Sequence, residues 1–394
     1  MMNGKDDSIE MKTETLIKTW DELDLKEDLL RGIFAYGFEN PSDIQKKAIL
    51  PMIQGRHLIA QAQSGSGKTG SFSIGALQLL DVSSHQTQVL ILENTHELAK
   101  QTAKVLEDIG NHMDQLCIKT LIGGTSTRED LDFFKAKTPH VVVGTVGRVV
   151  DMFQKGALRA DHLKTIILDE ADEILSSGFN EKIHLLFQRY FLSTSQIVLF
   201  SATMPPEILS LSHEFMKNPV SILVKKEDLN LKCIQQFFVA VKNDNMKYDV
   251  IKDLFSLISV SKCIIYCNNV KRVVLLHESM IRDGFSVCCI HSEMDKTERN
   301  TSYQQFRYGD TRVLISSDIT ARGIDIQQVS TVINFDITRN VNTYLHRIGR
   351  SGRWGRKGFA INLVTQMDIP DMKNIENHYG IEINALPDNF TGQI

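Results

Sequence analysis

This chain of 394 residues lacks the features that would place it in a membrane or direct it out of the cell. No apolar run reaches the roughly 18 residues that a membrane-spanning helix needs. Residues 1–12 are polar and of mixed charge, unlike a signal or transit peptide, so we expect a short disordered tail at residues 1–18. A chain of this length suits two domains, since a single core rarely grows so large.

Paired cysteines are missing as well. The spacing of the six cysteines does not match the Cys-x-x-Cys pattern of zinc sites, and four of them lie in apolar, strand-like runs. They are Cys117, Cys233, Cys263, Cys267, Cys288 and Cys289. We therefore expect buried, reduced thiols and a reducing compartment inside the cell, the cytoplasm or alternatively the nucleus.

An excess of positive charge is also absent. The chain has 44 Lys and Arg against 48 Asp and Glu, a net charge of −4. Proteins that bind nucleic acid at all times usually carry a strongly basic surface. Any contact with nucleic acid is therefore expected to be local, in a cleft.

Short apolar runs alternate with helix-like stretches in both halves of the chain. In the first half the runs are residues 57–60, 89–92, 141–143, 165–168 and 197–200. In the second half they are residues 263–266, 287–290, 313–315, 332–335 and 360–363. This pattern predicts an α/β fold with mostly parallel sheets covered by helices on both faces. We expect domains at residues 19–223 and 233–394, joined by a charged linker at residues 224–232.

A glycine-rich segment ending in Lys-Thr follows the first apolar run. In such a loop, backbone amides at a helix N-terminus hold phosphates, the lysine reaches the β- and γ-phosphates, and the threonine hydroxyl binds Mg²⁺. The segment departs from G-x-x-x-x-G-K-[ST] only at its first position, and a flexible turn is the alternative. The candidate ATP-binding residues are Ala62, Gln63, Ser64, Gly65, Ser66, Gly67, Lys68 and Thr69.

Two adjacent carboxylates follow another apolar run, residues 165–168. In an ATP hydrolase, Asp169 would bind Mg²⁺ through water, and Glu170 would orient and deprotonate the attacking water. Acids are also common at solvated helix starts, where the helix dipole favours them. Because the sequence also contains a candidate phosphate-binding loop, we favour a catalytic role for these two acids.

Three arginines near the C-terminus, Arg347, Arg350 and Arg353, recur at every third position. This spacing predicts that they lie along one side of a helix, and an ordinary basic surface helix is the alternative. Two glycines among them would cost a helix roughly 1 kcal/mol each, which indicates close approach to a ligand instead. Arg350 and Arg353 could stabilise the charge of a departing γ-phosphate, so that one ATP site would form from distant segments only when the domains close.

These segments, in this order, resemble the DEAD-box RNA helicases from about residue 20 to the C-terminus. The resemblance rests on the phosphate loop, Asp169-Glu170-Ala171-Asp172, Ser201-Ala202-Thr203, Ala321-Arg322-Gly323-Ile324-Asp325 and the segment from His346 to Arg353. It implies two RecA-like domains that close on ATP and single-stranded RNA, and an RNA-stimulated ATPase that unwinds short duplexes.

Within the family, three segments are most similar to helicases of translation initiation: residues 175–179, 222–226 and 324–330. An ATP-gated RNA clamp in exon-junction, splicing or ribosomal RNA processing complexes is the alternative. The resemblance also implies a monomer that works with a protein scaffold of the initiation-factor type.

The resemblance assigns further residues. Gln45 would read the adenine edge and Phe38 would pack on its ring, while Gly323 and Asp325 would lie at the ribose. The residues that would couple ATP to domain closure are Asp172, Ser201, Thr203 and His346. The residues that would contact RNA are Thr95, Gly123, Gly124, Thr145, Gly147, Arg148, Arg299, Ser317 and Gly323. Contacts of this kind reach the RNA backbone, so we expect binding independent of base sequence, with RNA told from DNA by its 2′-hydroxyls.

The departures from the family pattern gather on the RNA side. His96 stands where the family has arginine, Val146 where it has proline, and Ser317 where it has threonine, and residues 291–296 also differ. Because histidine is mostly neutral at pH 7, we expect weaker RNA binding than is typical of the family. Alternatively, His96 packs inward and a neighbour such as Arg128 binds the RNA.

Overall fold

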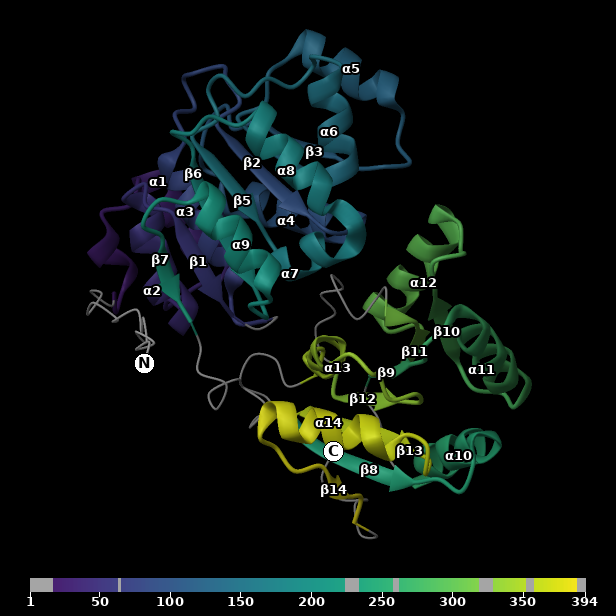
Figure 1. Cartoon of the computed structure of the whole chain (residues 1–394). Coiled ribbons are helices and arrows are strands. Elements are labelled where there is room, and N and C mark those ends of the chain that lie inside the picture. Colours follow the sequence, from purple (N-terminus) through teal and green to yellow (C-terminus); the bar gives the residue numbers. More distant parts are fainter. Residues whose placement is uncertain are drawn as a thin grey trace, which may run out of the picture.

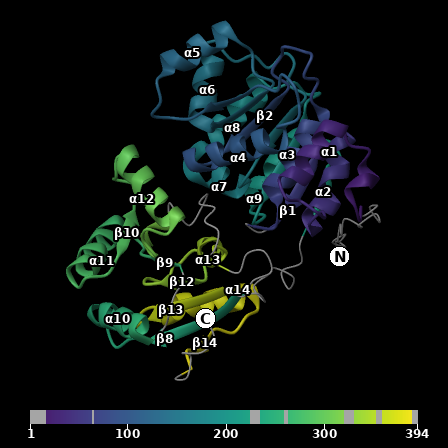
Figure 2. The ribbon, with the colours of Figure 1, turned by 180° about the vertical axis from the view of Figure 1, so that it is seen from behind.

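The computed structural model describes residues 17–62, 65–223, 234–257, 262–318, 329–351 and 358–387. Two sheets follow one another along the chain, each of seven strands with helices around it (Figure 1). Seen from behind, helices again cover both sheets (Figure 2). The predicted α/β fold with two RecA-like domains is confirmed.

The first sheet has the strand order β3-β4-β2-β5-β6-β1-β7, with parallel pairing. Its strands are β1 (Leu58–Gln61), β2 (Val89–Glu93), β3 (Ile118–Leu121), β4 (Val141–Thr145), β5 (Thr165–Leu168), β6 (Gln196–Ser201) and β7 (Val220–Ile222). The helices are α1 (Glu27–Ala35), α2 (Asp43–Ile53), α3 (Lys68–Leu79), α4 (His96–Ile109), α5 (Thr127–Ala136), α6 (Val146–Gln154), α7 (Ala171–Ile174), α8 (Asn180–Arg189) and α9 (Pro206–Phe215). Shorter helical turns are η1 (Trp20–Leu23) and η2 (Leu175–Phe179).

The second sheet has the order β10-β11-β9-β12-β13-β8-β14, again with parallel pairing. Its strands are β8 (Ile234–Ala240), β9 (Cys263–Tyr266), β10 (Val287–Ile290), β11 (Val313–Ser316), β12 (Thr331–Asn334), β13 (Gly358–Val364) and β14 (Asn384–Ala385). The helices are α10 (Lys247–Leu257), α11 (Val270–Arg282), α12 (Lys296–Tyr308), α13 (Val341–Ile348) and α14 (Ile369–Tyr379), with a short turn η5 (Asp244–Met246).

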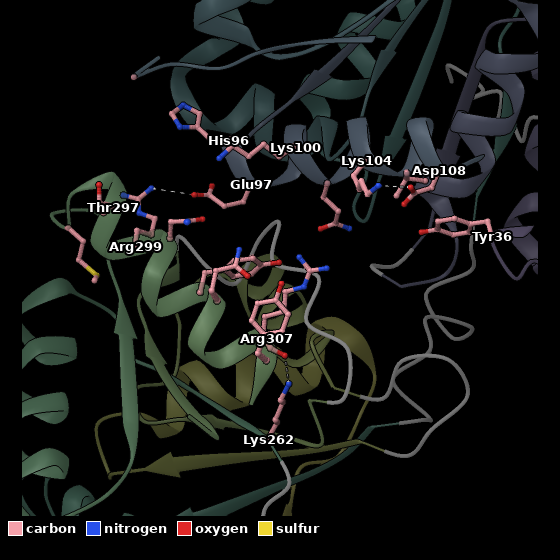
Figure 3. Close-up of a pocket in the computed structure, with 18 residues that line it drawn as sticks. Tyr36, His96, Glu97, Lys100, Lys104, Asp108, Lys262, Thr297, Arg299 and Arg307 are labelled. Atoms are coloured by element: carbon pink, nitrogen blue, oxygen red, sulfur yellow. Dashed lines mark hydrogen bonds and ion pairs between the residues drawn. The ribbon is translucent and has the colours of Figure 1, made fainter. Parts of the chain in front are cut away.

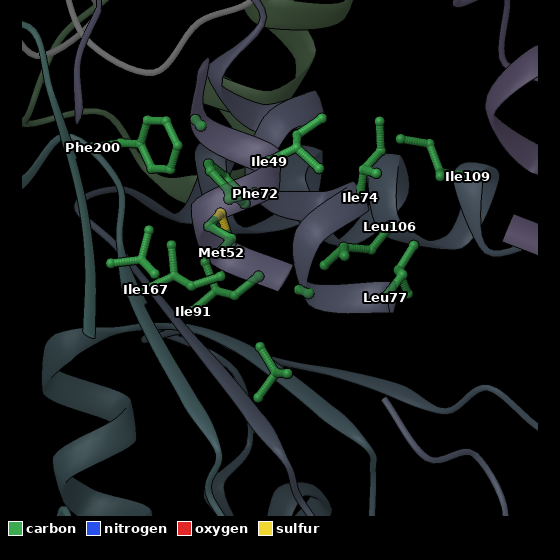
Figure 4. Packing of buried hydrophobic residues seen from close by; sticks show 14 of the residues in the cluster. Ile49, Met52, Phe72, Ile74, Leu77, Ile91, Leu106, Ile109, Ile167 and Phe200 are labelled. Carbon is green, nitrogen blue, oxygen red and sulfur yellow. The ribbon is translucent and has the colours of Figure 1, made fainter. Parts of the chain in front are cut away.

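Both faces of the first sheet are buried, which is why its strands read as uninterrupted apolar runs. Side chains of a strand alternate between the faces, so Ile91 and Ile167 pack in one core cluster while Leu90 and Ile166 pack in the other. Figure 4 shows the first cluster, in which Phe72 of α3 lies among the buried side chains. These two cores fix the carboxyl ends of the strands, where the candidate site residues follow.

Each of the ten predicted apolar runs forms or overlaps a strand. Four further strands, β3, β7, β8 and β14, were not predicted. β3 and β7 form the edges of the first sheet, and β14 forms an edge of the second. These three edge strands are short or partly exposed, and β8 is fully buried at only two of its seven positions, so their sequences lack the continuous apolar run on which the prediction relied.

The predicted N-terminal tail is too long at its C-terminal end. Ile17 is only 2% exposed and belongs to the same core cluster as Trp20. Its backbone N–H also donates to the carbonyl of Lys46, at 3.4 Å. Ordered structure therefore starts no later than Ile17. The predicted linker, residues 224–232, lies outside the described residues.

The prediction that three arginines share one helical side is wrong. Helix α13 ends at Ile348 with Gly349 as its C-cap, so Arg347 lies on the helix and Arg350 lies beyond it. Glycine has a low helix propensity and commonly terminates a helix, which explains the early end. Arg353 lies outside the described residues. None of the helices in the described ranges has the length and apolar character to cross a membrane.

Candidate active site and nucleic-acid interface

The candidate phosphate loop lies between β1 and the N-terminus of α3. Gly67, the N-cap of α3, has φ 101°, a conformation that glycine adopts without strain. A Cβ at Gly67 would lie 2.6 Å from Ser42 Oγ, and the Ser42 hydroxyl donates to the Ser66 carbonyl at 2.9 Å. The loop is thus held against the start of α2. Gln63 and Ser64 lie outside the described residues.

The structure places both predicted adenine-binding residues against the same helix. The buried Gln45 accepts a hydrogen bond from the Ser42 backbone N–H through its Oε1, at 2.7 Å. A Cβ at Gly70, in the first turn of α3, would lie 2.7 Å from Gln45 Nε2 and 2.9 Å from Phe38 Cε2. The predicted adenine-binding residues thus lie against the start of α3, next to the predicted phosphate loop.

The predicted catalytic acids come directly after β5 and face the lysine of the loop. Lys68 Nζ lies 3.9 Å from Asp169 Oδ1, and both side chains are buried. Glu170 has φ 47°, an uncommon backbone conformation for a residue other than glycine, and its N–H donates to Asp169 Oδ1 at 2.9 Å. Residues held in such conformations gather at functional sites.

Two buried polar atoms of this cluster have no hydrogen-bond partner within the described part of the chain: Lys68 Nζ and Glu170 Oε2. A buried amine or carboxylate without a partner is costly, so the folded state is expected to supply one. A polyphosphate would satisfy the lysine, and a water molecule would satisfy Glu170. The donor set of one hydroxyl, on Thr69, and one carboxylate, on Asp169, fits Mg²⁺, which prefers oxygen ligands and retains several waters.

Electrostatics set this cluster apart from ordinary surface acids. Burial, together with the charge of the neighbouring Glu170, raises the pKa of Asp169 to about 6 against the opposing charge of Lys68. A third acid, Glu93, was missed by the sequence analysis. Its Oε1 accepts from the Thr102 hydroxyl at 2.6 Å, and burial together with the charge of Asp169 raises its pKa well above the usual value. The available signal was its position directly after the apolar run 89–92, on the strand next to β5.

The predicted coupling residues form a connected network. Asp172 Oδ2 accepts hydrogen bonds from the Thr203 N–H at 3.1 Å and from the Thr203 hydroxyl at 2.6 Å. The Ser201 hydroxyl donates to the Thr203 carbonyl at 2.6 Å and accepts from the Asp172 N–H at 3.3 Å. The turn after β6 is thereby tied to the helix that begins beside Glu170.

His346 brings the second domain into this network. Its Nε2 lies 3.6 Å from Asp172 Oδ2 and 3.4 Å from Glu173 Oε1, and all three side chains are buried. Burial alone favours the neutral form of Asp172, but the facing His346 side chain and the hydrogen bonds from Thr203 hold its pKa well below the usual value. A contact between the two domains thus lies within about one helical turn of the predicted catalytic acids.

The two described arginines of the C-terminal segment have different environments. Arg347 is fully buried and donates to Asp318 through Nε, to the Asp336 carbonyl at 2.7 Å and to Asn268 Oδ1 at 2.8 Å. These bonds stay inside the second domain. Arg350 Nε donates to the His346 carbonyl at 3.3 Å, so it is anchored to the residue that contacts Asp172. The predicted ligands Gly323, Asp325 and Arg353 lie outside the described residues.

Arg148 was predicted to contact RNA, but its charge is already paired inside the first domain. Its guanidinium is buried and donates to Asp130 Oδ2 at 2.6 Å and to the Thr125 carbonyl at 2.7 Å. It thereby supports the loop that follows β3 and does not present a free charge. The small residues predicted at this surface lie at the end of β4 or in the loops and helix starts after β2, β3 and β4: Thr95, Gly123, Gly124, Thr145 and Gly147.

An interdomain cleft of about 920 Å³ lies beside these loops (Figure 3). His96 and Gly124 line it from the first domain and Arg299 from the second. Arg299 Nη1 lies 3.9 Å from Glu97 Oε1, so the two walls meet there. Ser317 directly follows β11. Arg128, the alternative to His96 as an RNA contact, is 91% exposed and lies near Asp132.

Comparison with known proteins identifies the family. Residues 42–211 match the DEAD/DEAH box helicase family, and residues 246–355 match the helicase conserved C-terminal domain. The chain is 49% identical over 388 residues to the ATP-dependent RNA helicase eIF4A of Eremothecium gossypii, covering 98% of this chain and 97% of that protein. The chain belongs to the DEAD-box helicase family.

Other proteins similar to this DEAD-box helicase support the same family assignment. Eukaryotic initiation factor 4A of Caenorhabditis elegans is 46% identical over 389 residues, 99% of this chain and 96% of that protein. The structure of S. cerevisiae Dbp5 bound to RNA and ADP BeF3 is similar with a TM-score of 0.87 at 32% identity, covering 94% of this chain and 96% of that one. The predictions of an ATP-dependent RNA helicase and of nucleotide use are thereby confirmed.

Proposed function

We propose that this DEAD-box helicase unwinds short RNA duplexes in translation initiation, using Mg²⁺ and ATP bound between its two domains. The observation that carries the proposal is the contact of His346 with Asp172 and Glu173. It links the second domain to the buried cluster of Lys68, Asp169 and Glu170, so nucleotide in that cluster can control domain closure. The assignment to translation initiation is supported by similar proteins that are named as initiation factors.

In the proposed reaction, each residue of the first domain has one task. Lys68 and the amides of the loop bind the phosphates, and Glu170 orients the attacking water and accepts its proton. Thr69 and Asp169 would hold Mg²⁺, which neutralises phosphate charge when bound. Phe38 and Gln45 bind the adenine.

The second domain completes the site in the closed form. Arg350, anchored to His346, supplies positive charge to the γ-phosphate as the bond to it breaks, and Arg353 and Asp325 are proposed to bind the nucleotide beside it. Once the γ-phosphate is released, that attraction is lost and the domains separate. The RNA is bent between the closed domains, and this expels the second strand.

RNA binding is proposed to be independent of base sequence. The residues assigned to it are small side chains and backbone groups in the loops after β2, β3 and β4, together with Arg299 and Ser317, which suits contacts to phosphates and sugars. We further propose that the chain acts as a cytoplasmic monomer with a protein scaffold that keeps the domains in register.

The chemical assignment is tested with Glu170→Gln, which removes the base but retains the shape of the side chain. Steady-state ATP hydrolysis should be lost, while RNA binding that depends on ATP should persist, since Lys68 and Asp169 are unchanged. Hydrolysis close to that of the original chain would disprove the role of Glu170.

The assignment to translation initiation needs a separate test. A translation extract depleted of its own initiation helicase should regain activity when this chain is added, and the Glu170→Gln variant should fail to restore it. If the chain unwinds duplexes normally but gives no recovery, another RNA process is its function.

A further inference from the structure

The interdomain cleft extends well past the residues assigned to RNA. From His96, Gly124 and Arg299 it follows α4 to Asp108 and reaches Tyr36 at the end of α1 (Figure 3). Along α4, the 12 steps from His96 to Asp108 span about 18 Å, because an α-helix rises about 1.5 Å per residue. The opposite wall is formed largely by α12 of the second domain. We call this extension the α4–α12 groove.

The α4–α12 groove is basic in a protein whose net charge is −4. Its basic side chains are Lys100, Lys104, Lys262, Arg299 and Arg307, and its acidic ones are Glu97 and Asp108. The balance of five cations and two carboxylates is +3, counting histidine as neutral. Positive charge concentrated between two walls attracts a polyanion.

Two of these five cations are already paired with carboxylates, and three are not. Lys104 Nζ lies 2.6 Å from Asp108, and Arg299 lies 3.9 Å from Glu97. Within the described ranges, no carboxylate lies at ion-pair distance from Lys100, Arg307 or Lys262, and Lys262 Nζ instead donates to the Arg307 carbonyl at 2.9 Å. Two of these three cations lie on opposite walls, Lys100 on α4 and Arg307 on α12. A chain of phosphates lying along the groove can pair with both.

Aromatic rings lie among these cations. Tyr36, Tyr303 and Tyr308 line the groove. Tyr308 directly follows Arg307 in the sequence, and it is 76% exposed. Alternating cations and exposed aromatic rings are typical of surfaces that bind single-stranded nucleic acid, where phosphates meet the cations and bases stack on the rings. An acidic peptide would use the cations but would gain little from the rings.

We propose that the α4–α12 groove binds the part of an RNA single strand that continues beyond the residues assigned to its centre. This rests on the proposed RNA-binding function and extends it to a longer footprint. The groove has walls from both domains, so RNA in it also favours the closed form.

The test compares RNAs of two lengths in the presence of a non-hydrolysable ATP analogue. An RNA of about 6 nucleotides is short enough to occupy the centre alone, and one of about 15 also reaches the groove. The double variant Lys100→Glu/Arg307→Glu removes one free cation from each wall. The control variant Lys217→Glu/Lys271→Glu makes the same charge change at exposed positions, one in each domain, that do not line the groove.

We expect the groove variant to bind the longer RNA at least about ten-fold more weakly than the control variant, and the shorter RNA equally well. The dependence of log affinity on log salt for the longer RNA should become less steep by about 1.4, since each phosphate contact to a single strand contributes about 0.7. Tyr308→Ala, which changes no charge, should also weaken only the longer RNA, by at least about five-fold.

Other outcomes overturn the proposal. If both RNAs lose affinity equally, the cations act at the centre; if neither does, the groove binds no RNA, and displacement of an acidic peptide from it would then identify a protein ligand. Absence of ATP-dependent binding of the shorter RNA to the unmodified chain would instead refute the proposed function itself.

Discussion

Arg347→Met should destabilise the second domain without acting through the ATP site. The arginine is fully buried, and its guanidinium is held by Asp318, Asn268 and the Asp336 carbonyl. Removing one partner of a buried ion pair costs about 3–5 kcal/mol, because the other charge stays without compensation. Asp318 is 36% exposed and can be partly hydrated, so we expect the lower end, about 3 kcal/mol.

A loss of this size is a large part of the roughly 5–15 kcal/mol that stabilises a domain, so the variant should fold but unfold at lower denaturant. Because the chain has two domains, the measurement must report on the second alone. Cys263 and Cys267 are buried there, and mass spectrometry of their alkylation along a urea series gives its unfolding midpoint. Cys117 serves as the internal reference in the first domain.

The result that refutes the reasoning is an unchanged midpoint for Cys263 and Cys267 together with loss of ATP hydrolysis. That outcome would mean that Arg347 turns toward the nucleotide in the closed form, as the spacing of the arginines first suggested. An equal shift at Cys117 would show that the two domains unfold as one unit.

Three further predictions follow from the same structure. Arg350→Ala should lower ATP turnover by on the order of 10³-fold, as removal of an arginine finger does, yet leave the urea midpoint at Cys263 unchanged; a shifted midpoint would make Arg350 a structural residue as well. His96→Arg should tighten RNA binding in the ATP-bound state by at least about ten-fold, since an arginine–phosphate bond contributes about 1.5–3 kcal/mol, and should not alter hydrolysis without RNA. Equal affinities by fluorescence anisotropy would instead favour Arg128 as the RNA contact. Burial raises the pKa of Cys288 to about 11, so its thiolate fraction and its alkylation rate in the folded protein should be very low near neutral pH and rise as pH increases toward that value; rapid labelling at about pH 8 would contradict its burial.

The sequence by itself determined the fold and most of the candidate ATP site. Ten strands were readable because a strand buried on both faces must be apolar throughout, as in Val141 to Val143. The glycine at position 67 and the acids after β5 were also readable, since a left-handed loop and a divalent cation each require particular residue types. Requirements of this kind are met by residues that are adjacent in the sequence, so they can be recognised without the structure.

Only the tertiary structure decided what depends on residues far apart in the chain. Arg347 and Arg350 are equivalent by spacing, but packing buries the first against Asp318 and anchors the second to His346. Arg148 is basic in sequence yet is committed to Asp130, and Glu93 becomes part of the acidic cluster only because β2 lies beside β5. A side chain's charge is set by its own identity, whereas its availability to a ligand is set by the partners that folding brings to it.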